Sequence, residues 1–512
     1  MMKLSKYIGI AIYVFLNILP FISHAQKINW QNLDLAADST FGISTEKAYN
    51  EFLIGKHSHT VIVAVIDGGV DTAQEDLKSK IWNNPKKNKI ADAHGWNYIG
   101  GSNGNVQFDN LELVRQIRQQ RSVFAKDSST DSTSFETYSR DLQQLARRVK
   151  EAQNNLSGFT RFEKVLEIML KSMGNGKPTK ADFQNYVAET DMEGQVKSTV
   201  LFYLEKGMSF QDFKEQQVDR NLEHYQSELN YHLNINFDPR STIGDNYNNK
   251  KENNYGNSNV TGPNAMHGTH VAGIIAATRN NNIGINGVAD NVRIMVLRVV
   301  PDGDERDKDV ANAILYATKN GAKIINMSFG KSISPDKKII DNAVKYALSK
   351  DVLFVQAAGN DNHDIDTVPN FPNRLYAEGK GEASAWIVVG SSSWLDNTAL
   401  KSPFSNYGKK AVDVFAPGEQ IRSTIPGNKY AAFDGTSMAC PVVSGLAALI
   451  REYYPKLTAV QVKEIILKSV TKVNHPVNII SGGKTTSVPF NELCLTGGIV
   501  NAYNALQLAA SY

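Results

Sequence analysis

Ser437 stands where a serine could either cap a helix or act as a nucleophile. It lies in DGTSMACPVVSGLAALI, residues 434–450, where small and polar residues run directly into an almost wholly apolar segment. A serine before a helix is commonly a cap, because its oxygen accepts a backbone N–H of the first turn. A nucleophilic serine also needs a base, a group that orients the base, and donors for an oxyanion. This stretch alone leaves both interpretations open.

Two histidines in HGTHVAGIIAAT, residues 267–278, are candidates for the base. Small residues around them and the apolar run that follows predict a buried helix that begins near His267. A His-x-x-His pair also raises the question of zinc, but no glutamate follows the first histidine as in zinc peptidases, and no third ligand is evident. We therefore interpret His267 as the base and His270 as structural.

Asp67 is the candidate for orienting the histidine, because it ends the apolar run VIVAVID at residues 61–67. A buried carboxylate would fix the imidazole tautomer and stabilise the imidazolium. Asp-Gly-Gly is also common in turns and at strand ends. The paired motif of aspartic peptidases is a further alternative, but the chain shows no convincing second copy.

Asn360, in QAAGN at residues 356–360, could donate its side-chain amide to an oxyanion. The backbone N–H of Ser437 could be a second donor, since the N-terminus of a helix carries partial positive charge. The predicted helix would then both hold the serine and stabilise the charge that forms beside it.

These motifs resemble the subtilisin-like serine peptidases, the subtilases, over about residues 50–105 and 255–510. The motifs that carry the resemblance are VIVAVIDGGVD, HGTHVAG, AAGN and GTSMACP. The order Asp, His, Ser is that of subtilisin and differs from chymotrypsin and the α/β-hydrolases. The resemblance implies a triad of Asp67, His267 and Ser437, with Asn360 as oxyanion donor. It also implies an exported serine endopeptidase that cleaves protein or peptide substrates through an acyl-enzyme and needs no cofactor for the chemistry.

The resemblance further implies a substrate site. Its walls would be formed by Ser328, Phe329 and Gly330 on one side and by Ala357, Ala358 and Gly359 on the other. Extended substrate would add to these edges as a β-strand.

Four features depart from the family pattern or leave alternatives open. Gly68 follows the aspartate where the family usually has Ser or Thr, so one hydrogen bond to the carboxylate is in doubt. The loop 277–290 resembles a calcium-binding loop but is one residue longer, and structural calcium stays open. The acidic stretch 301–309 could favour basic substrates or hold an ion, although a solvated charged turn is the favoured interpretation. The stretch before Asp67 is short for the family's inhibitory propeptide.

The sequence gives less support to two alternative functions. A related scaffold that binds peptides without cleaving them would normally lack a triad residue or Asn360, and all four are present. An acid peptidase of the sedolisin type would have Glu and Asp in place of His267 and Asn360.

Buried strands that alternate with amphipathic helices must position these residues. The strand-like runs are 61–67, 293–300, 322–330, 351–360, 385–393 and 411–418, and the helical patterns are 310–321, 339–351 and the segment after Ser437. Continuous apolar runs and βαβ spacing predict an α/β fold with a mostly parallel, helix-flanked sheet. Sites form beyond the carboxyl ends of such strands.

The chain divides into four predicted segments: a signal peptide at 1–25, a first catalytic part at 26–110, a helical insertion at 111–231 and a second catalytic part at 232–512. In the insertion glycine is sparse, apolar residues recur at helical spacing, GNGKP at 174–178 breaks the pattern, and Thr179 is predicted to cap the next helix. Both ends of the insertion should lie near the rim of the active site. We hypothesise that the insertion forms a lid over the cleft, and an insertion that only stabilises the fold is the alternative.

Composition is typical of a globular protein, with 512 residues, 41% hydrophobic and 21% charged. Lys3 and Lys6, an apolar run and Ser-His-Ala predict cleavage after Ala25 and export to a periplasm or the medium, with no membrane span afterwards. The net charge of +3 loses two lysines with the signal and falls to +1, which gives no reason to expect a nucleic-acid partner. Cys440 and Cys494 are expected as buried free thiols, with one disulfide as the alternative.

Overall fold

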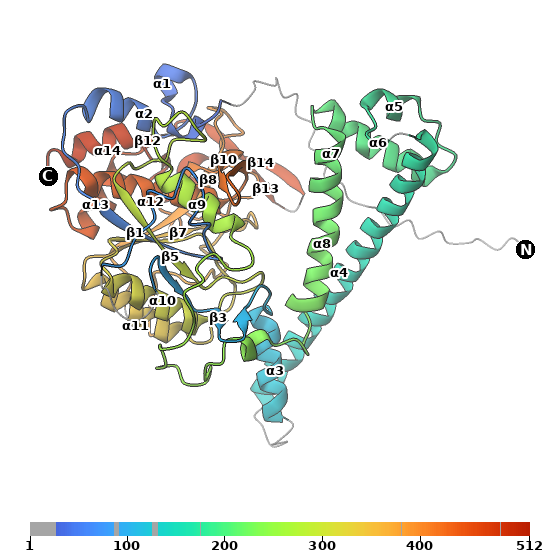
Figure 1. Cartoon of the computed structure of the whole chain (residues 1–512), viewed down its shortest axis with the longest axis horizontal. Helices are drawn as coiled ribbons and strands as arrows, with labels where there is room; N and C mark the ends of the chain where they lie inside the picture. Colours follow the sequence, from blue (N-terminus) through green and yellow to red (C-terminus); the bar gives the residue numbers. More distant parts are fainter. Residues whose placement is uncertain (1–26, 86–91, 125–131, 175, 380, 482) are drawn as a thin grey trace, which may run out of the picture.

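The computed structural model describes residues 27–85, 92–124, 132–174, 176–379, 381–481 and 483–512. The predicted signal peptide lies outside these residues. Within them, a sheet of nine strands runs through the body in the order β12-β15-β9-β8-β7-β6-β1-β5-β2 (Figure 1). The pairs from β15 to β2 are parallel, and β12 is antiparallel to β15. The predicted α/β class with a mostly parallel sheet is confirmed.

Six of the nine strands, β1 and β5 to β9, lie close to their predicted places, whereas the short strands β2, β12 and β15 were not predicted. Their bounds are β1 Val61–Asp67, β2 Gly95–Asn97, β5 Val292–Arg298, β6 Ile324–Met327, β7 Leu353–Ala357, β8 Trp386–Ser392, β9 Val414–Pro417, β12 Thr471–Lys472 and β15 Gly498–Ile499. Small antiparallel pairs were not predicted: β3 Gly100–Gly101 with β4 Gly104–Asn105, β10 Ile421–Ile425 with β11 Lys429–Phe433, and β13 Pro476–Ser481 with β14 Lys484–Pro489.

Helices cover both faces of the sheet, and the sheet separates two hydrophobic cores. One core contains α9 (Met266–Ala276), α12 (Thr436–Tyr453), α13 (Ala459–Lys468) and α14 (Ala502–Ala509), and the other contains α10 (Asp307–Lys319) and α11 (Lys337–Leu348). Alternate residues of β1 enter the two cores: Val63 and Val65 the first, Ala64 and Ile66 the second. A strand buried on both faces must be apolar throughout, which explains the run VIVAVI.

The segment before β1 is part of the body. It contains Trp30–Asn32, α1 Leu35–Asp38, α2 Thr45–Lys47 and a π-helical turn at Ala48–Phe52. Trp30 is 1% exposed and donates its indole N–H to the carbonyl of Glu419, while the carbonyl of Ile43 accepts the N–H of Ala502. The segment is thus held in the same core as α12.

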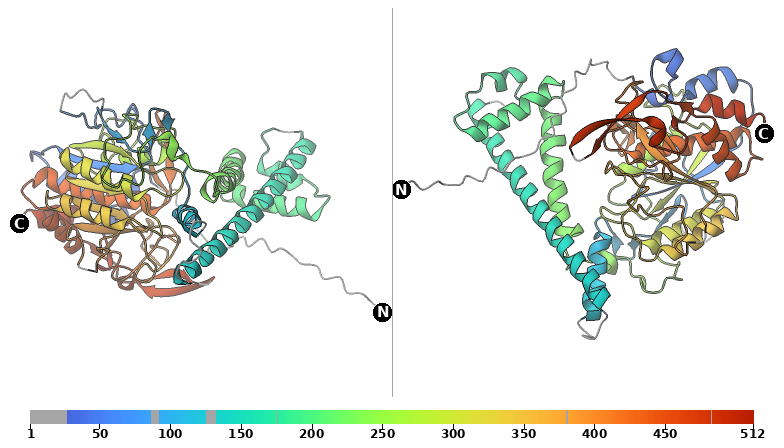
Figure 2. Two further views of the ribbon diagram at one scale, coloured as in Figure 1. Left: turned by 90° about the horizontal axis from the view of Figure 1, so that it is seen from below. Right: turned by 180° about the vertical axis from the view of Figure 1, so that it is seen from behind.

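The predicted insertion consists of helices that stand beside the body as an arm (Figures 1 and 2). The bounds are α3 Glu112–Phe124, α4 Ser132–Met173, α5 Lys180–Asn185, α6 Asp191–Glu205, α7 Phe210–Phe213 and α8 Arg220–Ser227, with π-helical stretches at Lys214–Asp219 and Glu228–His232. Thr179 caps α5 as predicted, in a capping box with Asp182.

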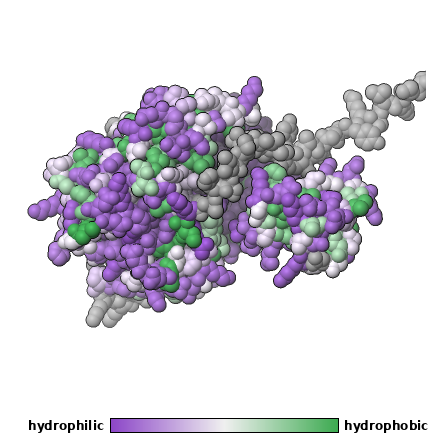
Figure 3. All heavy atoms as spheres, turned by 90° about the horizontal axis from the view of Figure 1, so that it is seen from above, coloured by the Kyte–Doolittle hydropathy of each residue, from purple (hydrophilic) through white to green (hydrophobic). Residues whose placement is uncertain are grey.

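The arm has apolar cores of its own. The outer one includes Leu166, Phe183, Val200 and Phe213, and the inner one packs α3 against α4. From above, the outer end of the arm is a separate mass of atoms, and its surface, like that of the body, is largely hydrophilic with scattered apolar residues (Figure 3). The division into domains at 110 and 231 stays a prediction, and so does the lid.

Candidate active site

Four predicted site residues lie at the carboxyl edge of the parallel sheet. Asp67 is the last residue of β1, and Asn360 follows β7. His267 and Ser437 are each the second residue of a helix, α9 and α12 respectively. Because β1, β6 and β7 are neighbours in parallel, their carboxyl ends and the helices that pack across them meet at one place.

Asp67 and His267 form a hydrogen-bonded pair although 200 positions separate them. His267 Nδ1 lies 2.9 Å from both carboxylate oxygens. Since a carboxylate only accepts, Nδ1 carries the proton and Nε2 is left with a free lone pair. The side chain of Asp67 is 3% exposed and that of His267 is 45% exposed. Desolvation of the ring by itself would lower the pKa of His267, but the charge and hydrogen bond of Asp67 outweigh it and raise the pKa above 6.5.

The backbone of Gly68 holds the Asp67 carboxylate. Its N–H donates to Oδ1 at 2.6 Å, so that oxygen has a donor besides the imidazole. A Cβ at this position would lie 3.2 Å from the carbonyl oxygen of Val300 and 3.6 Å from that of Asn264. The backbone thus supplies one hydrogen bond at the point where the family usually has a hydroxyl-bearing residue.

Ser437 does not cap α12. The N-cap is Gly435, and no side chain caps the helix. The Ser437 hydroxyl donates instead to the carbonyl of Ser328 at 3.0 Å, and the hydroxyl of Ser328 donates to the carbonyl of Ser437 at 3.0 Å. Pro441, four residues on, has no N–H to donate to the carbonyl of Ser437, and the Ser328 hydroxyl replaces that missing helical donor. Among the described residues, Ser437 and His267 share no hydrogen bond, which is common in free enzymes.

Two N–H donors converge beside Ser437. The Asn360 Oδ1 accepts the backbone N–H and the hydroxyl of Thr436, both at 2.9 Å, so its amide Nδ2 faces the other way. A Cβ built on Gly435 would lie 3.5 Å from Asn360 Nδ2 and 3.6 Å from Ser437 N. Both donors therefore border one small space, and glycine leaves that space open.

The two predicted walls follow neighbouring strands. Ser328, Phe329 and Gly330 come after β6, and Ala357, Ala358 and Gly359 end or follow β7. Sequence reasoning missed Asn370, which joins the walls: its Nδ2 donates to the carbonyl of Ala358 at 3.1 Å, and its Oδ1 would lie 2.6 Å from a Cβ on Gly330. Nothing in the local sequence marks Asn370, because only the tertiary structure brings it to Gly330.

His270 and Cys440 are structural. His270 is fully buried, donates Nε2–H to the carbonyl of Ala431 at 3.1 Å and stacks on Phe433, and burial lowers its pKa to about 3. Cys440 and Cys494 are both buried and free, which confirms the default expectation over the disulfide. Burial raises the pKa of Cys440 to about 12, so its thiol is neutral.

The interpretation of the acidic stretch 301–309 as a solvated charged turn is wrong for residues 305–309, whereas Asp302 is exposed. Glu305, Arg306, Asp307, Lys308 and Asp309 are 0–4% exposed. Partners come from the two segments that flank the insertion: Arg306 binds Asp109 at 2.7 Å, Lys308 binds Asp245 at 2.7 Å, and Arg240 binds Asp309 at 2.6 Å. These partners lie 63 to 197 positions away, so the local sequence could not reveal the pairing.

Asp76 and Glu46 are carboxylates that face the loop 277–290, and Glu46 is paired with Arg279. The oxygens of Asp76 accept Asn281 Nδ2 at 2.6 Å and the N–H of Ile285 at 3.2 Å, and burial raises the pKa of Asp76. Across the described residues, no group of three or more His, Cys, Asp or Glu could hold a metal ion. A calcium ion here would rely on Asp76 with neutral oxygens, a donor type that calcium accepts. Calcium binding stays a prediction.

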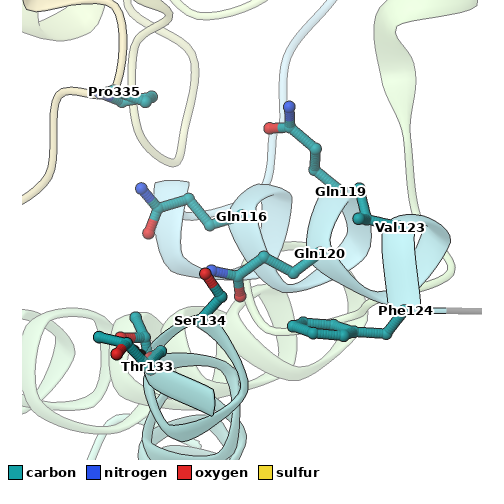
Figure 4. Close-up of a pocket in the computed structure, with 9 residues that line it drawn as sticks. Gln116, Gln119, Gln120, Val123, Phe124, Thr133, Ser134 and Pro335 are labelled. Atoms are coloured by element: carbon teal, nitrogen blue, oxygen red, sulfur yellow. Dashed lines mark hydrogen bonds between the residues drawn. The ribbon is translucent and has the colours of Figure 1, made fainter. Parts of the chain in front are cut away.

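A pocket of about 420 Å³ lies away from the triad, between α3, the start of α4 and Pro335 of the body (Figure 4). Gln116, Gln119 and Gln120 line it with Val123 and Phe124. None of the predicted site residues borders it, and we assign it no chemistry.

The chain matches known peptidases in sequence. The family model described as "Subtilase family" matches residues 58–483. A thermophilic serine proteinase of Bacillus sp. (strain AK1) is 38% identical over 43% of this chain and 51% of its own length. Thermitase of Thermoactinomyces vulgaris is 43% identical over 36% of this chain and 60% of its own length, and subtilisin BL of Lederbergia lenta 37% over 42% and 74%.

A solved protease structure from Pseudoalteromonas arctica is 27% identical, with a TM-score of 0.41, and covers 50% of this chain and 80% of that chain. The family match extends over most of the chain and includes all four predicted catalytic positions. This protein belongs to the subtilase family.

Proposed function

We propose that this protein is a serine endopeptidase that cleaves peptide bonds through Asp67, His267 and Ser437. The observation that carries the proposal is the Asp67–His267 pair at the same carboxyl edge of the sheet as a serine whose neighbouring N–H donors border one open space. The experiment is to react the purified chain with a fluorophosphonate probe, which labels activated serines. No labelling, together with no turnover of casein or peptides, would reject the proposal.

The first chemical step requires Ser437 to turn. Its hydroxyl leaves the Ser328 carbonyl and donates to His267 Nε2, which has the free lone pair. Oγ then attacks the substrate carbonyl as His267 takes the proton, and Asp67 stabilises the imidazolium. His267 gives the proton to the leaving amine, and water repeats the sequence to release the acyl group.

We expect Asn360→Ala to lower kcat by roughly 10²–10³-fold with little change in KM. The reason is that an oxyanion donor acts mainly in the transition state; this magnitude was measured on subtilisin, a member of the same family. Steady-state kinetics on a peptide substrate measures it. The matched control is Asn362→Gly, two residues on, where φ is 53° and glycine fits without strain. Equal losses in both variants would contradict a role for Asn360 in the oxyanion site.

Asn370 should limit the side chain that precedes the scissile bond, because it spans the two proposed pocket walls. We expect Asn370→Gly to shift the ratio of kcat/KM for Phe over Ala at that position by roughly tenfold or more in favour of Phe. Two matched peptides measure the ratio. Asn373→Ala is the control, because Asn373 donates to the backbone of Asn370 and not to a wall. An unchanged ratio in Asn370→Gly would show that Asn370 does not determine the preference for the side chain before the scissile bond.

Three further expectations complete the proposal. We propose protein or peptide substrates, export directed by residues 1–25, and structural calcium at the loop 277–290. None of the helices in the described part of the chain is long and apolar enough to span a membrane.

A further inference from the structure

The segment that follows β6 changes from exposed to buried between Gly330 and Lys331. Ser328 lies beside Ser437, so it marks the position of the scissile bond. Gly330, two residues on, is exposed, whereas the next residue, Lys331, is 5% exposed. Lys331 also pairs through its backbone with Phe371, N–H to carbonyl at 2.9 Å and 2.8 Å in the two directions.

The first turn of α3 encloses Lys331. The Lys331 ammonium donates to Glu112 Oε2 at 2.8 Å and to the carbonyl of Glu305 at 2.8 Å. It also lies 2.8 Å from Asp307 Oδ1. Glu112 is itself 4% exposed. The insertion therefore contributes a side chain to the end of the edge along which substrate is proposed to extend.

The facing segment, which follows β5, is already paired. Arg115 donates to the carbonyl of Asp304 at 3.0 Å and to that of Glu305 at 3.2 Å. The Glu112 N–H donates to Asp304 Oδ2 at 2.7 Å. Upstream, the N–H of Asp109 donates to the carbonyl of Asp302 and the N–H of Asp302 donates to the carbonyl of Gln107, which pairs Asp302 in parallel with Phe108. Because the carbonyls of residues 304 and 305 already accept hydrogen bonds from Arg115, they are not available to pair with a substrate strand.

We propose that the first turn of α3 closes the end of the cleft that takes the N-terminal side of the substrate. This inference rests on the proposed function. Paired strands advance by the same rise per residue, so the edge 328–330 can pair with roughly three substrate residues before the scissile bond. Residues farther from the bond meet Lys331, Glu112 and Arg115 and gain no backbone hydrogen bonds. Specificity is then set close to the bond.

The test is a series of N-terminally blocked peptides that share one leaving group and carry one to five residues before the scissile bond. We expect kcat/KM to rise up to about three residues and to change less than twofold from three to five. A continued rise of tenfold or more between three and five residues would overturn the proposal. If no peptide of any length is cleaved and the fluorophosphonate probe does not react, the proposed function itself fails.

Two variants on α3 test whether Arg115 is the residue that closes the cleft. Arg115→Ala frees the carbonyl of Asp304 and removes one of the two donors to the carbonyl of Glu305, the other being Lys331. Each hydrogen bond that a substrate gains there is worth about two- to tenfold. We therefore expect the ratio of kcat/KM for five over three residues to rise roughly fivefold or more. Arg118→Ala is the matched control, since Arg118 binds the carbonyl of Ile235 and the carboxylate of Asp238 instead. If the ratio of kcat/KM for five over three residues rises in neither variant, or rises equally in both, closure by Arg115 is contradicted. If Arg115→Ala does not fold, the wild-type series still decides.

Discussion

Replacing Ser437 by Ala is expected to remove peptide turnover and fluorophosphonate labelling together, and His267→Ala is expected to do the same. The losses in kcat should be on the order of 10⁶-fold, a magnitude measured on subtilisin, a member of the same family. The physical reason is that the hydroxyl is the nucleophile and is unreactive without a base at Nε2.

The two losses should not add, because each replacement disables the same unit. The double variant is therefore expected to be about as slow as either single one. Ser444→Ala is the matched control: Ser444 lies on the same helix and donates to Asn326, away from His267. Retained labelling in Ser437→Ala would show that another serine reacts and would reject the assignment.

Asp67→Asn should lower kcat by about 10⁴-fold, the size found for this change in another Asp-His-Ser triad. The amide can donate to Nδ1, so the proton moves to Nε2 and the lone pair that must take the serine proton is lost. Circular dichroism should show an intact fold, because asparagine has nearly the same shape.

The same variant should change the pH profile in a defined direction. Activity needs neutral His267, and Asp67 raises the pKa of His267 above 6.5, so the acid limb of kcat/KM for the wild type should lie above that pH. Without the carboxylate the pKa of His267 falls, so the acid limb of kcat/KM should move to lower pH. The plateau value of kcat/KM should also drop. A limb at the same pH in both proteins would show that Asp67 does not set the charge state of His267.

The elements of the body could be predicted because their burial leaves a pattern in the chain. β1, β5 to β9 and the helices between them read as apolar runs and amphipathic repeats, since a strand in the middle of a layered sheet has no polar face. The short pairs β10–β11 and β13–β14 were missed. β14 is mostly exposed and β11 has no fully buried residue, so neither has the sequence pattern of a buried strand.

The residue types of the site were also readable from the sequence, but their geometry was not. Asp67, His267, Asn360 and Ser437 each stand in a motif, whereas the hydrogen bond from Ser437 to Ser328 and the place of Asn370 between two walls have no local signal. The buried ion pairs of residues 305–309 show the same limit, because a charge run looks solvated until its distant partners are known.

The sequence by itself determined the fold class, the candidate groups of the proposed site and a helical stretch between Asp67 and His267, because these follow from periodicity and residue type. Only the tertiary structure decided which loop approaches which. It placed His267 Nδ1 on the Asp67 carboxylate, and it set α3 with Glu112 and Arg115 against Lys331 and residues 304–305. The physical reason is that burial selects local patterns, whereas contacts between distant loops depend on how the whole chain closes around its core.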